Sequence, residues 1–151
     1  MIVGNGIIAN IFRSNFNDDT YLIFAFGVSD STEENINEFN REEKLLLEMI
    51  DKYPNLKLIY FSSIFCGLKF DRYYTHKMKM ESLIIKNSKD FLIFRLPQVI
   101  GNGGNNKNLF NFFIDSIRND KVLKIKKNTQ RSLIDIDDVF KIVFYCINKS
   151  N

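Results

Sequence analysis

The stretch Ile2-Val3-Gly4-Asn5-Gly6-Ile7-Ile8-Ala9 starts with two β-branched residues and passes through two glycines into an apolar run. This pattern predicts a short strand, a tight turn and a helix, which together begin a βα unit. Gly4 permits the tight turn, Gly6 lets backbone approach a pyrophosphate, and Ala9 lets the helix pack closely on the strand. The first N–H groups of the helix would then point at the phosphate. The alternative is a strand–helix turn that merely needs glycine.

Composition places the chain among ordinary globular proteins. Its 151 residues carry a net charge of +3, and 45% of them are hydrophobic and 26% charged. We expect one domain spanning residues 1–151. Cys66 and Cys146 cannot form a disulfide framework, and no paired spacing indicates a metal site. Two reduced thiols fit a reducing compartment.

Targeting and partner signals are weak. The apolar N-terminus breaks at Gly4 without a basic region before it, which argues against a secretory signal. The apolar runs are far shorter than the roughly 20 residues needed to span a bilayer. We therefore expect a cytoplasmic protein with no membrane partner. A basic stretch at residues 121–131 could attract phosphates, but a solvated loop is the preferred interpretation, and no nucleic-acid partner is expected.

Short apolar runs alternate with longer helical patterns along the chain, which is typical of βα units. The pattern predicts an α/β fold: a three-layer, Rossmann-like parallel sheet with helices on both faces and a reduced number of strands. For the second helix, Ser31 with Glu34 forms a capping-box signal, and Thr32 is the alternative cap. The apolar stripe expected on this helix consists of Phe39, Leu45, Leu46, Met49 and Ile50. Residues 101–108 read as a loop. Strands are expected at 2–3, 21–26, 56–61, 91–94 and 122–125, and helices at 7–14, 31–53, from 73, at 109–117 and from 135–138 to 147.

A tyrosine followed four residues later by a lysine occurs three times. Tyr53 precedes a proline, which marks a turn, and Tyr145 lies close to the C-terminus, where helices fray. Tyr73 and Lys77 share one face of an expected helix that follows the Ser62-Ser63 end of a strand. Open α/β sheets bind ligands at that end of their strands, so context selects this pair.

The chemistry of this pair fits proton transfer. A phenol with a reference pKa near 10 needs help to exchange a proton at neutral pH, and a lysine ammonium one helical turn away stabilises the phenolate. A serine hydroxyl can hold a substrate oxygen, and Ser63 is preferred to Ser62 by a small margin because it lies further past the strand. Hydride exchange between a nicotinamide and a sugar carbon then becomes feasible.

The chain resembles the extended short-chain dehydrogenase/reductases, specifically their NAD-dependent epimerase/dehydratase branch. The resembling pieces occur in the family's order over nearly the whole chain, which is more specific than any single motif. They are residues 2–9, Phe24-Ala25-Phe26-Gly27-Val28-Ser29, Ile59-Tyr60-Phe61-Ser62-Ser63, Tyr73-Tyr74-Thr75-His76-Lys77, residues 94–101 and Arg131-Ser132-Leu133-Ile134-Asp135-Ile136-Asp137-Asp138-Val139.

The resemblance implies a set of site residues. Ser63, Tyr73 and Lys77 would be catalytic, and NAD or NADP would be the cofactor. Ser62, Gln98 and Arg131 would contact a nucleotide-sugar substrate, with Arg131 meeting its phosphate. Asp137 and Asp138 would start a helix, with simple N-terminal capping as an equal alternative. The expected cofactor-binding residues are Gly4, Asn5, Gly6, Ile7, Ile8, Ala25, Phe26, Gly27, Lys77, Pro97 and Val99.

Two departures from the family matter. Only one helix fits between Ala9 and Phe24, so the family's second and third strands are missing, and residues 21–26 correspond to its fourth strand. The alternative makes 21–26 the second strand, with Asp30 as the ribose-binding acid. The preferred interpretation leaves the first strand at a sheet edge with half of the adenine pocket gone. The stretch between Ser63 and Tyr73 is also short for the usual substrate loop.

The resemblance therefore implies an NAD(P)-dependent epimerase, dehydratase or reductase acting on a nucleotide-activated sugar in polysaccharide biosynthesis. It also implies that two copies could form a homodimer by helix pairing. The alternative is a catalytically inactive Rossmann-fold binding or regulatory module that has lost part of the adenine site. His76 is expected to face solvent or to pack, away from the Tyr73 face. Phe110, Phe112 and Phe113 are expected in the core or on a helix-pairing face.

Overall fold

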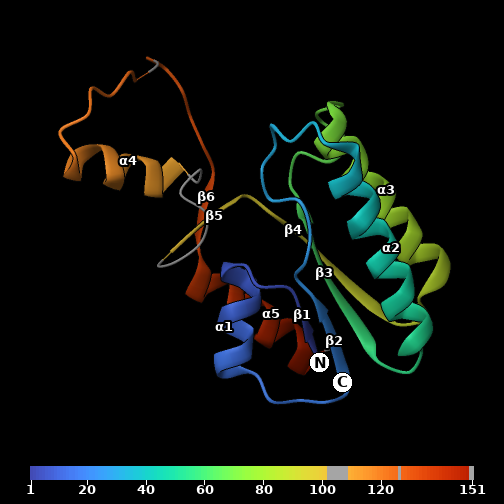
Figure 1. The fold of residues 1–151 in the computed structure, drawn as a ribbon. Coiled ribbons are helices and arrows are strands. Elements are labelled where there is room, and N and C mark those ends of the chain that lie inside the picture. The colour runs from blue at the N-terminus through green and yellow to red at the C-terminus, as the bar shows by residue number, and fades with distance from the viewer. Residues whose placement is uncertain (102–108, 126, 150–151) are drawn as a thin grey trace.

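The computed structural model describes residues 1–101, 109–125 and 127–149 (Figure 1). The expected loop at 101–108 lies outside the described residues except for Gly101. The elements are β1 (Ile2–Val3), α1 (Ile7–Asn15), β2 (Tyr21–Phe24), α2 (Ile36–Lys52), β3 (Lys57–Ser63), α3 (Arg72–Asn87), β4 (Phe91–Leu96), β5 (Gln98–Ile100), α4 (Leu109–Arg118), β6 (Leu133–Asp135) and α5 (Ile136–Lys149).

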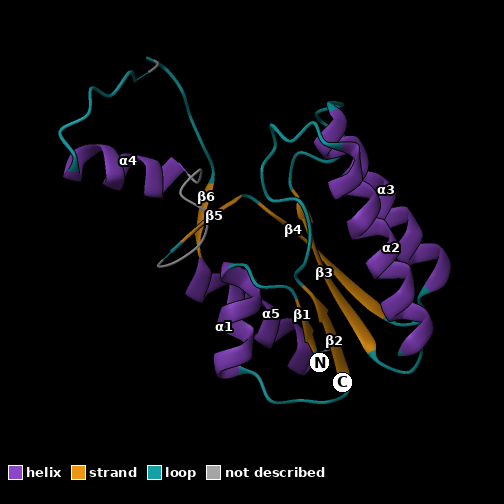
Figure 2. Ribbon diagram, in the orientation of Figure 1, coloured by secondary structure: helices purple, strands orange, loops and turns teal. Residues whose placement is uncertain are grey.

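Four parallel strands form the main sheet, in the order β1-β2-β3-β4. The register pairs Ile23 with Ile2 on one side and with Ile59 on the other, and Ile59 in turn with Leu92. The strands β2 and β3 are buried along nearly their whole length because helices cover both of their faces. This confirms the expected three-layer α/β architecture (Figure 2).

One face of the sheet packs against α1 and α5. Phe12 of α1 lies at the centre of this layer, in ring contact with Phe16, Phe61 and Phe140. It is fully buried, as is Val143 of α5. The layer forms because the apolar residues of α1 and α5 recur at helical spacing and turn one stripe toward the strands.

The other face packs against α2 and α3. Leu46 of α2 and Met80 and Ile84 of α3 are fully buried against Leu22 and Leu58 of the sheet. The apolar stripe expected on the second helix is therefore confirmed. Figure 1 shows these two helices side by side, on the opposite side of the sheet from α1 and α5.

The sheet order decides between the two interpretations of residues 21–26. If they were the family's second strand, the strand after β3 would return to the far side of β1, as in the order 3-2-1-4 of a doubly wound fold. Instead β4 pairs with β3. The fourth-strand interpretation is confirmed, and among the described residues β1 pairs only with β2 and so lies at an edge of the sheet.

The C-terminal third departs from expectation. Residues 122–125 are not a strand; Val122 is 91% exposed. Ile125 is also exposed, at 74%, so the apolar side chains at the two ends of this segment do not pack against the rest of the described residues. The strand that does form is β6, which pairs in parallel with β5 as a separate two-stranded sheet. Asp137 and Asp138 lie in the first turn of α5. The Asp135 carboxylate accepts a hydrogen bond from Asp137 N at 2.9 Å.

The start of α2 was also predicted wrongly. Neither Ser31 nor Thr32 caps the helix, which begins at Ile36 with Asn35 as its N-cap. The Asp30 carboxylate accepts hydrogen bonds from the backbone N–H and the hydroxyl of Thr32, at 2.9 and 2.6 Å, and folds this segment into a turn. No helix of the described residues is long and apolar enough to cross a membrane.

Candidate functional site

The carboxyl ends of the parallel strands bring together segments that are distant in the sequence. A Cβ on Gly4, after β1, would overlap the carbonyl group of Ala25, after β2. Gly101, after β5, lies close enough to Ile7 at the start of α1 that a Cβ would contact it at 3.2 Å. The glycine turn, the end of β2 and the end of β5 therefore meet at one edge, as ligand sites of open α/β sheets do.

The glycine turn itself is open on its outer side. Gly6 is the N-cap residue of α1, and a Cβ built on it would meet no atom within 4 Å. A glycine cannot cap the helix with a side chain, so the first N–H groups of α1 have no side-chain partner from this position. The turn thus combines free space with the positive end of a helix dipole, which suits an anion.

The lysine predicted to be catalytic lies in a buried cluster around Glu42. The Lys77 ammonium donates to Glu42 Oε1 at 2.9 Å and to the hydroxyl of Tyr60 at 3.2 Å. The Tyr60 hydroxyl in turn donates to Glu42 Oε1 at 3.0 Å. Glu42 comes from α2, Tyr60 from β3 and Lys77 from α3, so the contact between the two helices and the sheet builds the cluster.

Two further groups hold the second oxygen of Glu42. His76 Nε2 lies 3.3 Å from Glu42 Oε2, and the backbone N–H of Val28 donates to the same oxygen at 2.9 Å. His76 is buried and stacks edge-on against Phe39, with the ring centroids 4.8 Å apart. It therefore packs and does not face solvent, which settles the two alternatives left open for it.

The Glu42 carboxylate also explains why residue 27 is a glycine. Its φ of +142° is one that L side chains rarely adopt, and a Cβ at this position would overlap the Glu42 carboxyl group. The absence of a side chain at Gly27, three residues after β2, therefore leaves space for the Glu42 carboxylate. The cofactor contact predicted for Gly27 stays a prediction.

Electrostatics keep Glu42 ionised although it is fully buried. Burial alone would raise the pKa of its carboxyl group. The positive charge of Lys77, with the hydrogen bonds from His76, Lys77 and Val28 N–H, outweighs burial and lowers the pKa to about 2. The cluster is therefore a satisfied ion pair and not an uncompensated charge.

Tyr73 lies beside this pair. The Lys77 ammonium is 5.8 Å from the centroid of the Tyr73 ring. Burial raises the pKa of the Tyr73 phenol, and the negative charge of Glu42 is the next largest cause in the same direction. The phenol is thus neutral in this structure, with the charge of Lys77 balanced by Glu42.

The two serines at the end of β3 point to opposite faces of the sheet, since side chains alternate along a strand. Ser62 shares its face with Tyr60, and its Oγ lies 3.3 Å from the Cys66 sulfur. Ser63 lies on the other face, where its Oγ accepts a hydrogen bond from Phe65 N at 3.3 Å. The structure places Tyr73 and Lys77 together on the face of the sheet that carries Tyr60, whereas Ser63 lies at the end of β3 on the opposite face. The catalytic role of Ser63 stays a prediction.

The remaining predicted contacts lie around β5. Pro97 links β4 to β5, which holds Gln98 and Val99, and Gln98 N donates to Ser132 O at 3.2 Å. Arg131 precedes β6, is exposed, and lies near enough to Tyr74 for its charge to act on that phenol. All four therefore lie beyond the carboxyl end of β4, and their ligand contacts stay predictions. Among the phenylalanines of α4, Phe110 and Phe112 are exposed, so the core interpretation is wrong for these two.

Glu42 and Tyr60 are the residues of this cluster that the sequence analysis missed. A signal for Glu42 was present: with Phe39 and Leu46 it forms the spacing i, i+3, i+7 that defines one face of a helix. An acid on an otherwise apolar face needs a buried partner. Tyr60 carried no comparable signal, because a tyrosine is common in an apolar strand.

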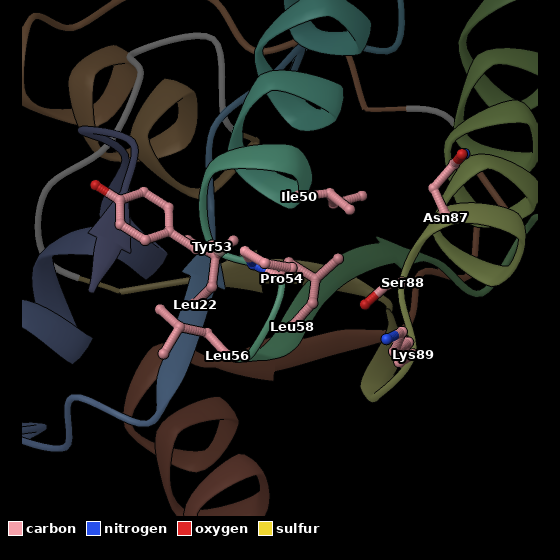
Figure 3. Close-up of a pocket in the computed structure, with 9 residues that line it drawn as sticks. All are labelled: Leu22, Ile50, Tyr53, Pro54, Leu56, Leu58, Asn87, Ser88 and Lys89. Carbon is pink, nitrogen blue, oxygen red and sulfur yellow. The ribbon is translucent and has the colours of Figure 1, made fainter.

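A small cavity lies at the other end of the sheet (Figure 3), lined by the end of α2, the start of β3 and the α3–β4 loop. Its volume is about 50 Å³, well below the several hundred Å³ of a nucleotide site. Tyr53, at the C-terminal cap of α2, is among its lining residues. This cavity is not the candidate site, which lies at the carboxyl edge.

Solved structures with this fold include the three that follow. Capsular polysaccharide assembling protein CapF from Staphylococcus aureus matches 94% of this chain, with a TM-score of 0.64 and 16% identity. dTDP-glucose 4,6-dehydratase from Bacillus anthracis, in complex with NAD, matches 99% with a TM-score of 0.67 and 15% identity. UDP-N-acetylglucosamine 4-epimerase from Methanobrevibacter ruminantium, in complex with UDP-N-acetylmuramic acid, matches 93% with a TM-score of 0.62 and 15% identity.

These matches concern the fold. The chain covers 38% of the CapF structure and 55% of each of the other two. No protein-family model matches the sequence, and the search of curated proteins gives no match. The comparisons therefore show a Rossmann-like architecture shared with these three structures, of which this chain spans about two fifths to a little over half.

Proposed function

We propose that this chain, which has the fold of NAD-dependent nucleotide-sugar dehydratases and epimerases, binds NAD or NADP and acts on a nucleotide-activated sugar in polysaccharide biosynthesis. The observation that carries the proposal is the open glycine turn at the start of α1, on the same sheet edge as the α3 helix that bears Tyr73 and Lys77. Epimerisation, dehydration and reduction of the sugar are all compatible with this arrangement.

The residues present fit the pyrophosphate of a dinucleotide. The space over Gly6 is one that a Cβ would fill, and the N–H groups that begin α1 would hold phosphate oxygens. Asn5, Ile7 and Ile8 would flank it, and Ala25 and Phe26 would border it from the segment after β2. Lys77, Pro97 and Val99 would lie toward the nicotinamide. When bound, the cofactor would supply hydride exchange with a sugar carbon.

The chain's own groups would handle the proton and the substrate. Tyr73 Oη would donate or accept the proton of the reacting sugar oxygen, and the Lys77 ammonium would favour the phenolate. Ser63 would hold that oxygen in place. Ser62, Gln98 and Arg131 would contact the rest of the substrate, with Arg131 meeting its phosphate.

A second candidate is a binding module without turnover, which one specific observation favours. The charge of Lys77 is already balanced by Glu42, and the pKa of Tyr73 is raised, so the phenol is not activated in this structure. The edge position of β1 adds to this, because no strand of the described residues continues the sheet on the adenine side.

Thermal unfolding in the presence of NAD, NADH, NADP and NADPH tests the proposal. A nucleotide at 100 times its dissociation constant should raise the free energy of unfolding by roughly 2.7 kcal/mol. Gly6→Asp is the matched variant: aspartate is a better N-cap than glycine and should leave the protein as stable or slightly more so. Its carboxylate would repel the pyrophosphate, so the ligand-induced shift should disappear.

The outcomes separate the candidates. No shift with any of the four nucleotides would overturn the cofactor proposal. A shift that persists in Gly6→Asp would move binding away from the glycine turn. If a nucleotide binds, Tyr73→Phe decides the rest: an enzyme loses turnover and keeps its fold, whereas a binding module loses nothing. Cytoplasmic location and homodimer formation remain parts of the proposal, and sedimentation of the purified protein tests the latter.

A further inference from the structure

The cluster around Glu42 contains a buried ion pair to which the lysine of the proposed site belongs. A buried ion pair contributes little net stability compared with apolar side chains of similar size. Yet four groups converge on this one carboxylate, and one of them is the lysine placed in the proposed site. The contacts that satisfy this buried carboxylate therefore also fix the lysine of the proposed site.

We infer that Glu42 is a positioning residue of the site: it holds the Lys77 ammonium between the Tyr60 hydroxyl and the Tyr73 ring and balances its charge. This inference deepens the proposed function and rests on it, because the charge of Lys77 matters only if Tyr73 transfers a proton. Glu42 acts through Lys77 and is not itself placed against substrate or cofactor.

The geometry supports this assignment in three ways. Glu42 and Lys77 are each almost completely shielded from water, so their attraction is little screened. The carboxylate cannot turn away, because the Val28 N–H and His76 hold its second oxygen. Gly27 leaves the space in which the carboxylate sits, so the pairing is built into the backbone at the end of β2.

The pairing of Glu42 with Lys77 affects the ionisation of the Tyr73 phenol. Lys77 alone, 5.8 Å from the ring, would favour the phenolate, but the paired carboxylate cancels that effect. Removal of the Glu42 charge would expose Tyr73 to an unbalanced ammonium. The titratable and charged groups that face Tyr73 or Glu42 are Tyr60 from β3, Cys66 and Asp71 before α3, and Tyr74, His76 and Lys77 on α3.

Titration of Tyr73 in the full chain tests the inference. NMR of protein labelled at the tyrosine ring carbon that bears oxygen follows each phenol, and loss of one signal in Tyr73→Phe assigns Tyr73. In Glu42→Gln, which keeps an oxygen that can accept from Lys77, ionisation of Tyr73 should begin at least one pH unit lower than in the wild type. Burial and the charge of Glu42 raise the pKa of the wild-type phenol, which should stay protonated up to the highest pH at which the protein is folded.

Glu42→Asp keeps the charge but draws the carboxylate back from Lys77 by one carbon, so a smaller decrease is expected. This variant also carries the test if Glu42→Gln does not fold. An unchanged or raised Tyr73 pKa in the folded variants would overturn the inference. Because the titration needs neither cofactor nor substrate, its failure is distinguishable from the failure of nucleotide binding in the thermal unfolding experiment.

Discussion

Glu42 and Lys77 are 35 residues apart in the sequence, and their side chains form a buried ion pair of 2.9 Å between α2 and α3. The pair joins the two helices that cover one face of the sheet. It also lies next to the end of β2, through the hydrogen bond from Val28 N–H. The same pair therefore affects both the stability of the protein and the chemistry of the proposed site. Its effect on the free energy of unfolding can be measured separately from its effect on the pKa of Tyr73.

Acid should destabilise the protein partly through Glu42. The pKa of this carboxyl group is held at about 2 in the folded chain and returns to about 4.5 on unfolding. Its contribution is therefore present above pH 4.5 and lost as the pH falls toward 2, with a full value of about 3 kcal/mol. Urea unfolding at a series of pH values should show this loss in the wild type.

Glu42→Gln should flatten the same profile, because the titrating group is gone. Glu48→Gln is the matched control, since Glu48 lies on the same helix but is half exposed, in a loose contact with Lys44. If Glu42→Gln kept the full acid dependence of the wild type, the stability would have to come from other carboxylates.

A double-mutant cycle should reveal strong coupling between Glu42 and Lys77. Glu42→Leu leaves the ammonium buried without its carboxylate and should cost about 3–5 kcal/mol of unfolding free energy. Lys77→Met should restore part of that loss when combined with it, with a coupling energy of about 1–3 kcal/mol. For the exposed pair Lys44 and Glu48, the same cycle should give less than about 1 kcal/mol. Equal coupling for both pairs would contradict a buried pair.

Gly27→Ala should destabilise the protein by about 3 kcal/mol or more, as measured by urea unfolding. The new methyl group would adopt an unfavourable φ and also displace the Glu42 carboxylate from its partners. Gly67→Ala is the control: its φ is also positive, but nothing lies within 4 Å of a Cβ there, so only the backbone cost of about 1 kcal/mol is expected. A similar loss in both variants would mean that the overlap with Glu42 is unimportant.

Phe12→Ala should cost about 3–5 kcal/mol, because the ring is fully buried between α1, the sheet and α5. Ile85→Ala, on the exposed side of α3, should change stability by less than about 0.5 kcal/mol. Denaturant unfolding checks both. A small effect at Phe12 would show that α1 and α5 contribute little to the folded state.

Much of the architecture followed from local pattern. The apolar runs at β2 and β3 and the helical stripe of Phe39 and Leu46 predicted a parallel sheet covered on both faces, which the structure confirms. Local signals failed where two of them competed. Ser31 and Glu34 had the spacing of a capping box. In the structure the Asp30 carboxylate instead accepts hydrogen bonds from Thr32 and forms a turn, and Asn35 is the N-cap of α2.

The candidate site could be predicted only in part. Helical spacing placed Tyr73 and Lys77 on one face, and the structure keeps the Lys77 ammonium close to the Tyr73 ring. The state of that lysine was not predictable, because its partners come from another helix and another strand. Only α2, β3 and α3 packed together bring Glu42 and Tyr60 to Lys77.

The sequence by itself determined the order of strands and helices from β1 to β4, the apolar faces and the open glycine turn, because each depends on neighbours within a few residues. Only the tertiary structure decided between the two interpretations of residues 21–26, and only it showed that β5 pairs with β6 and that Glu42 balances the charge of Lys77. Those outcomes depend on which distant segments share an edge or an interior space. In that space a buried charge must find its partner, however far away along the chain the partner lies.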